Sequence, residues 1–308
     1  MNKVPFPVVV AVAVNLAIAV AKYAAAFVTG SASMMAEAIH STVDTGNEAL
    51  LLVGVTQSRK PPDETHPFGH GQDAYFWSLV VAVVIFGAGG GAAILEGLRH
   101  IVQGSRLENV LWNYIVLGVA LAFESVSWTV SYRALRSDAP EMSLLEAVRA
   151  SRYPSRFVVL LEDSAAIAGL IIALVLGTSL ASLFPHARLD GIASILIGLV
   201  LICAAVFLVI KTRSLLVGEA ADKATVDGIR AILEKDADVE AVKRVLTMQL
   251  SPESILLNLD LRFRDGAGSA GGLPASISRL ERAIQQRYPE VKEIFIEAQA
   301  LAAHSPPR

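Results

Sequence analysis

The sequence has almost no cysteine: Cys203 is the only one in 308 residues. A disulfide framework needs cysteine pairs and a cysteine-type zinc site needs several, so both are excluded. Charged residues are also scarce, at 18%, and the formal net charge of −3 argues against a broad nucleic-acid-binding surface. Neither an ATP-binding GxxxxGK[ST] motif nor an HExxH helix is present. We therefore expect no enzyme and no bound cofactor.

Hydrophobic residues, in contrast, make up 54% of the chain, and the mean hydropathy is +0.53. Each of six runs is long enough for the roughly 20 helical residues that cross a bilayer. The first run resembles a signal peptide, but its apolar stretch is too long and a second run follows at once, so we interpret it as a transmembrane helix. The predicted spans are 6–29, 33–57, 75–100, 110–134, 157–182 and 190–211.

The placement of lysine and arginine predicts the orientation of these spans. Only Arg99, Arg106 and Arg188 fall on one side if six helices alternate. The other side carries Lys3, Arg59, Lys60, Arg133, Arg136, Arg149, Arg152, Arg156, Lys211 and Arg213. Because positive residues concentrate in cytoplasmic loops, we expect a multi-pass integral membrane protein with both termini in the cytoplasm. The bacterial inner membrane is the expected location.

The chain after the last span has the pattern of a small soluble domain. Helical spacing of apolar residues begins at Val226, and strict alternation follows over 257–263. A second helical pattern leads to a last short strand, which completes the order helix–strand–strand–helix–strand with both helices on one face. The predicted fold is an all-α membrane bundle of six helices over 1–212, then a cytoplasmic αββαβ domain of the α+β class over 213–300. Residues 301–308 are expected to be a disordered tail.

Ionisable residues interrupt the second run. His40 and Asp44 are four residues apart, so a helix projects them from one face, and Glu37 and Glu48 extend the same stripe. Ionisable groups at membrane depth are costly and usually mark a pathway or a binding site. An imidazole beside a carboxylate suits a divalent metal of the zinc type. The alternative is a structural hydrogen bond that joins two helices.

Further polar residues lie in other runs. Glu162 and Asp163 stand near the cytoplasmic end of the fifth run, where they form either part of a site or a helix-end charge pair neutralised by arginine. Glu124 in the fourth run is either a proton-relay residue or a helix-packing residue. Lys22 in the first run is long enough to extend its ammonium group to the membrane interface. The glycines of the third run, GAGGG at 87–91, favour close helix packing.

Four segments carry a family resemblance. They are HSTVD at 40–44, HPFGHGQDAYFWSL at 66–79, LDGIASILIGL at 189–199 and LLVGEAAD at 215–222. In this order they resemble the cation diffusion facilitator transporters. The resemblance implies a six-helix bundle with a cytoplasmic α+β domain, assembled as a homodimer that exports zinc or a related divalent ion in exchange for protons.

The resemblance also implies a metal site between the second and fifth helices. His40 and Asp44 match the second-helix ligand pair, and Asp163 matches one of the two fifth-helix ligands. The other fifth-helix position is Val159, which cannot bind metal, and Glu162 is the candidate replacement. The Glu-Asp pair is similar to that of one branch of the family. One nitrogen with two or three oxygens favours zinc less strongly than two nitrogens would.

An auxiliary site of the family has its counterpart between the second and third runs. This loop retains Asp63, His66, His70 and Asp73, which form either a second metal site or a capped, hydrogen-bonded turn. The cytoplasmic domain has no cysteine, and its one histidine is His304 in the tail. A zinc cluster is therefore not expected there, and dimerisation would depend on packing.

These features together favour an efflux transporter with Zn²⁺ as substrate, working as a secondary metal/proton antiporter. An imidazole has an intrinsic pKa of about 6.5, so His40 can exchange a proton for metal, with Glu124 as a second candidate in the relay. Fe²⁺, Co²⁺ or Mn²⁺ are alternative substrates. The rival function is a membrane-bound metal sensor or scaffold that acts through its cytoplasmic domain. The expected partners are divalent ions, protons, the bilayer and a second copy of the chain, and not nucleic acid.

Overall fold

The computed structural model describes residues 6–103, 109–138, 140–184, 188–264 and 272–299. The chain divides into two compact units, one of residues 1–57 and 73–213 and the other of residues 58–72 and 214–308. The predicted disordered tail lies outside the described residues.

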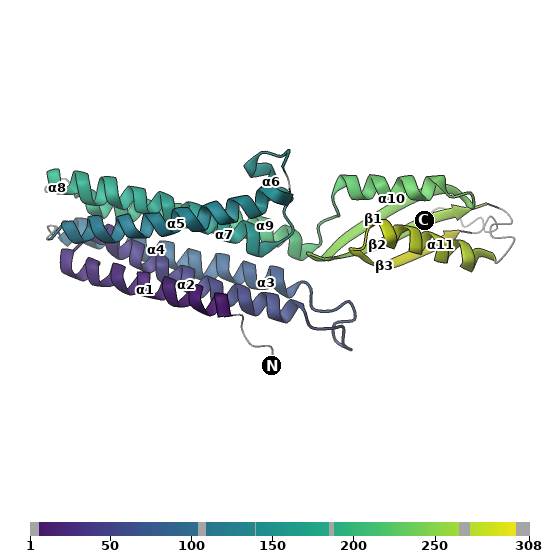
Figure 1. The fold of residues 1–308 in the computed structure, drawn as a ribbon, viewed down its shortest axis with the longest axis horizontal. Coiled ribbons are helices and arrows are strands. Elements are labelled where there is room, and N and C mark those ends of the chain that lie inside the picture. Colours follow the sequence, from purple (N-terminus) through teal and green to yellow (C-terminus); the bar gives the residue numbers. More distant parts are fainter. Residues whose placement is uncertain (1–5, 104–108, 139, 185–187, 265–271, 300–308) are drawn as a thin grey trace. The chain divides into compact units, whose positions relative to one another are not determined.

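The first unit is entirely helical in its described residues, and every predicted hydrophobic run lies in a helix (Figure 1). Two of the long helices contain a π-helical stretch, so that α3, η1 and α4 are continuous, as are α7, η2 and α8. The helices are α1 Phe6–Thr29, α2 Ala32–Ser58, α3 Asp73–Val80, η1 Val81–Phe86, α4 Gly87–Gln103, α5 Leu111–Asp138, α6 Leu144–Ala150, α7 Pro154–Ile172, η2 Ala173–Leu180, α8 Ala181–Leu183 and α9 Leu189–Val217.

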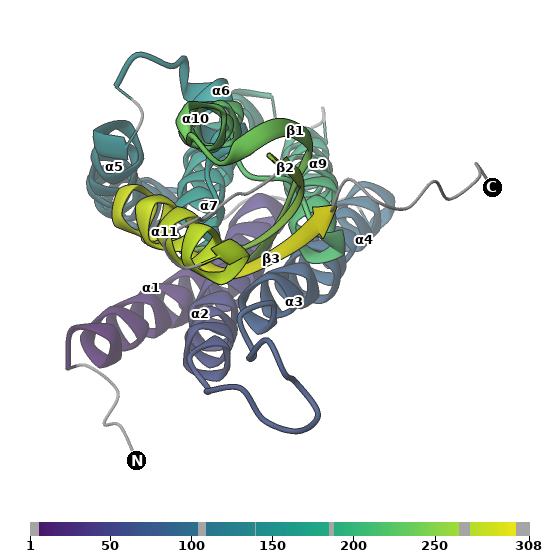
Figure 2. The ribbon, with the colours of Figure 1, turned by 90° about the vertical axis from the view of Figure 1, so that its right-hand side faces the viewer.

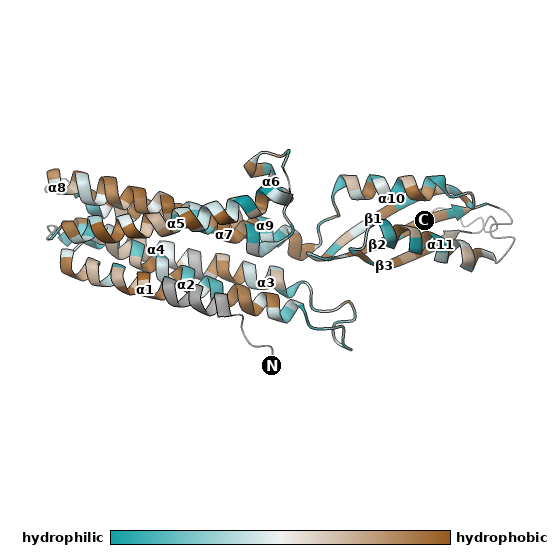
Figure 3. Ribbon diagram, in the orientation of Figure 1, coloured by the Kyte–Doolittle hydropathy of each residue, from teal (hydrophilic) through white to brown (hydrophobic). Residues whose placement is uncertain are grey.

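Among the described residues, four helical stretches are long and apolar enough to cross a membrane: Asp73–Gln103, Leu111–Ser137, Arg156–Leu183 and Leu189–Val217. Large apolar side chains such as Val126, Val206 and Ile210 are exposed on them, and hydrophobic residues cover α5, α7 and α9 in Figure 3. Such an exterior is stable in lipid and not in water. The protein is therefore an integral membrane protein.

The prediction of six spans is supported by composition for these four only. The α2 helix is long enough, but Glu37, Asp44 and Glu48 lower its hydropathy. The described apolar part of α1 is the shorter stretch Asn15–Thr29. Both helices are part of the same compact unit as the four apolar stretches, and their crossing remains a prediction.

Small residues allow the helices of this unit to approach closely. One core cluster of the unit contains alanines from α1, α2, α4, α5 and η2 around Met34, Leu117, Leu170 and Ile197. In a bilayer, where lipid is as apolar as leucine, such close packing is a main source of helix association.

In its described residues, the second unit contains a three-stranded sheet and two helices. The elements are α10 Lys223–Lys235, β1 Val239–Ser251, β2 Ser254–Phe263, α11 Gly272–Arg287 and β3 Val291–Gln299, which confirms the predicted order. The sheet order is β1-β2-β3, with β1 and β2 antiparallel and β2 and β3 parallel. Both helices cover the same face of the sheet (Figure 2). The alternating residues Leu257, Leu259, Leu261 and Phe263 of β2 form the centre of the core, as the period-2 pattern predicts.

The loop before α3 belongs to this second unit. Phe68 contacts Phe295 of β3 edge to face, with ring centroids 6.3 Å apart. Gly71 lies so close to Leu250 and Ser251 that a Cβ atom would be 2.5 Å from the Ser251 Cβ. Gly69 has φ +81°, a conformation that residues with a side chain rarely adopt. The loop is thus a defined structure and not a bare connection.

Candidate metal centres

The first candidate centre begins on α2. His40 and Asp44 are on one face of this helix, and His40 Nδ1 is 3.4 Å from Asp44 Oδ1. His40 is completely buried, and Asp44 is 7% exposed. A histidine held by a carboxylate is oriented and made more basic, which is a common arrangement at metal sites.

The α7 helix brings a carboxylate to the same place. Asn47 of α2 donates a hydrogen bond from Nδ2 to Glu162 Oε2, and the Glu162 and Asp44 side chains are within hydrogen-bonding reach of each other. Two buried carboxyl groups that meet across a helix interface repel each other when both are ionised. A divalent cation between them would remove this repulsion, so the pair is suited to bind one.

The carboxylate of the neighbouring residue, Asp163, points toward another helix, α5. Asp163 Oδ2 accepts hydrogen bonds from Ser127 Oγ at 3.0 Å and from Ser131 Oγ at 3.2 Å, both on α5. Consecutive residues of a helix point about 100° apart, so one of the two acidic residues faces α2 and the other faces α5. Glu162, offered by sequence only as a replacement ligand, is therefore the α7 carboxylate that contacts the α2 pair.

A cavity of about 310 Å³ joins these residues. Its acidic lining consists of Asp44 and Glu48 from α2, Glu124 from α5, and Glu162 and Asp163 from α7. Its other lining residues are Asn15, Ile18, Phe123, Val126, Ser127 and Val159. Among the described residues His40 is not part of this lining, and it contacts the cavity through Asp44. Val159, the position at which the family resemblance implies a ligand, also lines the cavity.

The sequence predicts Glu48 on the same stripe as His40 and Asp44, because residues four apart share a helix face. In the structure Glu48 lines the cavity and accepts a hydrogen bond from Asn15 Nδ2 at 2.8 Å. The serines at 127 and 131 carried no signal of their own, since their role depends on the packing of α5 against α7.

Lys22 differs from the sequence prediction. Its side chain is completely buried and does not extend to the surface of the unit. Its Nζ atom is 3.1 Å from Glu37 Oε2 and donates a hydrogen bond to Ser41 Oγ at 2.7 Å. A buried ammonium group persists where a carboxylate and a hydroxyl group satisfy it, and both come from α2.

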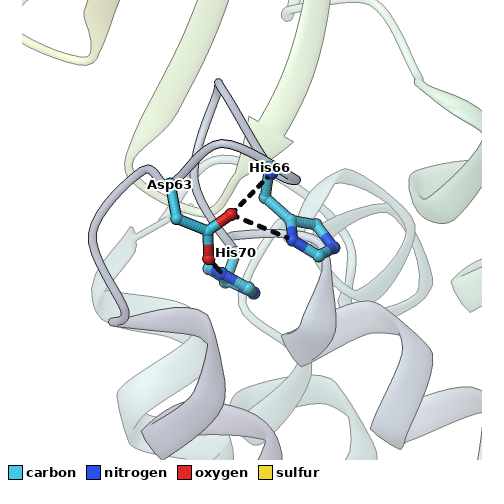
Figure 4. A group of neighbouring side chains, drawn as sticks. All are labelled: Asp63, His66 and His70. Atoms are coloured by element: carbon cyan, nitrogen blue, oxygen red, sulfur yellow. Dashed lines mark hydrogen bonds and ion pairs between the residues drawn. The ribbon is translucent and has the colours of Figure 1, made fainter.

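The second candidate centre is in the loop, where Figure 4 shows the Asp63 carboxylate facing both His66 and His70. Asp63 Oδ2 is 2.9 Å from His70 Nε2, and Asp63 Oδ1 is 3.5 Å from His66 Nδ1. One ligand atom from each of the three lies within 4.8 Å of the others. The His70 and Thr65 hydrogen bonds hold the pKa of Asp63 well below its usual range. An ionised carboxylate with two imidazoles is a suitable donor set for zinc.

The same aspartate also shapes the turn. Its Oδ1 accepts hydrogen bonds from the backbone N–H groups of Thr65 at 2.9 Å and His66 at 2.7 Å. The hydrogen-bonded turn is therefore present, while the other carboxylate oxygen faces His70 and the metal site stays a prediction. Asp73, the fourth predicted residue, begins α3 in the helical unit.

Comparisons with known proteins agree with this architecture. Residues 8–217 match the family described as the cation efflux transmembrane domain. The chain is 30% identical over 328 residues to the human proton-coupled zinc antiporter SLC30A9, mitochondrial, covering 94% of this chain and 58% of that protein. The Xenopus laevis protein of the same name gives the same identity and coverage. Metal tolerance protein C4 of Arabidopsis thaliana is 27% identical over 320 residues, covering 90% of this chain and 69% of that protein. The chain thus spans little more than half the length of the zinc antiporters it matches.

Proposed function

This chain belongs to the cation efflux family, that of the cation diffusion facilitators, and from that premise we propose that it exports Zn²⁺ in exchange for protons. Metal cation transport follows from the family. The choice of zinc and of protons is supported by the relatives named as proton-coupled zinc antiporters. Their similarity to this chain extends over 94% of its length.

One observation carries the proposal: the carboxylates of Asp44 and Glu162 meet across α2 and α7 at a cavity inside a helical membrane unit. His40 contacts Asp44 on the side away from the cavity lining, and Asp163 lines the same cavity from α7. Rotation of the His40 side chain toward the cavity would add a nitrogen to the oxygen donors. Mixed nitrogen and oxygen donors suit zinc, while a set dominated by oxygen also accepts Mn²⁺, Fe²⁺ or Co²⁺.

The mechanism follows from competition between metal and protons for these side chains. Metal requires a neutral imidazole and ionised carboxylates, so protons leave as it binds and return as it is released. Glu124, which lines the cavity from α5, is placed to accept such a proton. Exposure of the site first to one side and then to the other, by movement of one helix group against another, completes the cycle.

The proposal includes the arrangement in the membrane and the assembly. We place the lysine- and arginine-rich loops and the second unit in the cytoplasm, with α1 and α2 as further spans. The working form is a homodimer, as the family resemblance implies. The loop centre of Asp63, His66 and His70 is an auxiliary zinc site that also takes its metal from the cytoplasm.

Flux into proteoliposomes tests the proposed function. The purified full chain would be reconstituted and given Zn²⁺, Co²⁺, Fe²⁺ or Mn²⁺ under an imposed pH gradient. Zinc flux that is driven by the gradient and lost in Asp44→Asn is the expected result, because this change removes a charged ligand while retaining the shape of the side chain.

The controls distinguish transport from its rival. A sensor or scaffold would bind metal without moving it, so the absence of flux in protein that binds zinc would contradict transport. Undiminished flux in Asp44→Asn would instead remove α2 from the site. Flux that ignores the pH gradient would contradict the proton coupling alone.

A further inference from the structure

A buried ion pair lies beyond the transport site and is not used by the proposed mechanism. Lys22 of α1 and Glu37 of α2 are both completely buried, with Nζ 3.1 Å from Oε2. Replacing a buried ion pair by apolar side chains is often neutral or stabilising, so the pair needs a reason other than stability. Charged residues within membrane helices usually mark a pathway for ions.

The pair lies on the same two helices as the transport site. Glu37 is seven residues before Asp44 on α2, and Gly169 is seven residues after Glu162 on α7. Seven residues are almost two full turns, so each pair shares a helix face and is separated by about 10 Å along the axis. A Cβ atom at Gly169 would overlap with Glu37 Oε1, which shows that Glu37 faces α7 at that level.

Glu37 is only half satisfied by its partners. Its Oε2 atom contacts Lys22, whereas its buried Oε1 atom has no hydrogen-bond partner among the described residues. Ser41, one turn further on α2, contributes a hydroxyl oxygen to the same ammonium group. A carboxylate and a hydroxyl around one positive charge are the donors of a cation-binding position, and here the cation is a side chain of the protein.

We propose that Glu37 and Ser41 form a second cation position on the transport path, and that Lys22 occupies it as a tethered cation. Divalent metal consequently stops at Asp44 and Glu162 and is not captured by a second carboxylate about 10 Å further along. The ammonium group also interacts electrostatically with His40 and Asp44. Lys22 is thus a specificity-determining residue that limits the number and affinity of bound ions. This inference rests on the proposed function, since it needs the cavity to be a transport site.

Charge removal tests the inference. Purified full-length protein in detergent would be titrated with Zn²⁺ by calorimetry and equilibrium dialysis. Lys22→Met leaves a buried carboxylate without its counter-charge, so this variant should bind one more zinc ion per chain than the wild type, or bind at least about tenfold more tightly. Transport by this variant should slow, because tighter binding retards release.

The matched control removes both charges. Lys22→Met combined with Glu37→Gln should return to the wild-type number of ions, affinity and rate. Glu37→Gln alone, which leaves the positive charge unbalanced, should bind more weakly than the wild type. If Lys22→Met is not recovered folded, Lys22→Gln removes the charge while retaining a hydrogen-bond donor for Glu37.

The outcomes separate this inference from the proposed function. An added ion or higher affinity that disappears with Glu37→Gln supports it. A neutral variant at position 22 that binds zinc as the wild type does would overturn it and leave transport intact. A wild-type protein that neither binds nor moves zinc would overturn the proposed function itself.

Discussion

At the scale of single residues, the direction in which a side chain points determines its partners more than its chemical type does. Glu162 and Asp163 are chemically similar neighbours, but Glu162 contacts Asn47 and Asp44 on α2 while Asp163 accepts hydrogen bonds from two serines on α5. Both serine hydrogen bonds go to Asp163 Oδ2. The two carboxylates should therefore differ in how much metal binding depends on each.

The first prediction compares these neighbours. Glu162→Gln should weaken zinc binding by about tenfold or more, since even indirect ligand partners are worth 10–100-fold. Asp163→Asn retains the hydrogen-bonding shape toward Ser127 and Ser131 and should have a smaller effect. Calorimetric titration of both purified variants measures the difference. Equal losses would mean that both carboxylates bind metal directly, and a larger loss in Asp163→Asn would reverse the assignment.

The second prediction concerns the ligand that this chain lacks. Val159 lines the cavity one turn before Glu162 and Asp163, so a histidine there would add an imidazole to the oxygen donors. Val159→His should shift transport severalfold toward Zn²⁺ relative to Mn²⁺, because nitrogen donors favour zinc. Val159→Leu is the control with similar bulk and no ligand atom. Competition flux in proteoliposomes measures the ratio, and an unchanged ratio in Val159→His would place this position outside the metal site.

At the scale of elements, α4 and α9 pack closely against each other at glycine residues. Cβ atoms at Gly90 and Gly97 of α4 would lie 2.8 Å and 2.5 Å from the carbonyl oxygens of Gly198 and Gly191 of α9. The reverse distances, from Cβ atoms built at Gly198 and Gly191, are 2.6 Å and 2.9 Å. The two backbones thus approach closely at two levels, as small residues at a helix interface permit.

The third prediction tests that crossing. Gly97→Ala places a methyl group against the α9 backbone and should lower the free energy of unfolding by about 1–3 kcal/mol, the usual cost of overpacking. Gly91→Ala on the same helix is the matched control, because no atom lies within 4 Å of its Cβ position. Thermal unfolding of the full chain in detergent compares the two. Gly91→Ala should be neutral or slightly stabilising, because alanine has the higher helix propensity. A Gly91→Ala variant as unstable as Gly97→Ala would show that the crossing is not the cause of the loss.

The fourth prediction concerns the loop of residues 63–70. Its hydrogen bonds to the ionised Asp63 lower the pKa of that residue. They therefore stabilise the ordered loop fully at pH values above the ordinary aspartate pKa of about 3.9. This stabilisation is lost as the pH falls toward the lower pKa that Asp63 has in the ordered loop. The N–H groups of Thr65 and His66 donate hydrogen bonds to Asp63, so their protection from hydrogen exchange should fall as the pH is lowered. The protection in Asp63→Asn, measured at each pH, is the reference. Protection that is the same in both proteins at neutral pH would exclude the carboxylate as the organiser of the turn.

At the scale of the whole molecule, two units of different chemistry make up one chain. The helical unit has an apolar exterior and buries charged residues such as Lys22 and Glu37 among apolar side chains, whereas the second unit has an apolar core between its sheet and two helices. The loop of residues 58–72 is part of the second unit, although it connects two helices of the first. The sides of the membrane on which the connections lie are therefore the main question at this scale.

The fifth prediction uses the single cysteine as a tool. In a Cys203→Ser background, Lys60→Cys and Lys223→Cys should react with a membrane-impermeant maleimide only from the cytoplasmic side, and Arg188→Cys only from the opposite side. Intact cells and inside-out vesicles provide the two directions of access. Labelling of positions 60 and 223 from opposite sides would contradict an even number of spans between them.

The sequence by itself determined the class of the protein. The length of the hydrophobic runs, the period-2 alternation of residues 257–263 and the four motif segments are local properties, and each depends only on neighbours along the chain. They were sufficient for a membrane domain, the αββαβ order and the family. The same local spacing placed His40 with Asp44 and gathered Asp63, His66 and His70.

The tertiary structure decided which of these residues meet. The packing of α7 against α2 selects Glu162, and the packing of α5 against α7 assigns Asp163 to serines, although both acidic residues are equivalent in the sequence. Packing also buries the Lys22 side chain against Glu37 and Ser41. From its length alone, this side chain could equally have extended to the membrane interface. Helical periodicity fixes which face a side chain occupies, but the neighbour opposite that face depends on contacts between segments far apart in the chain.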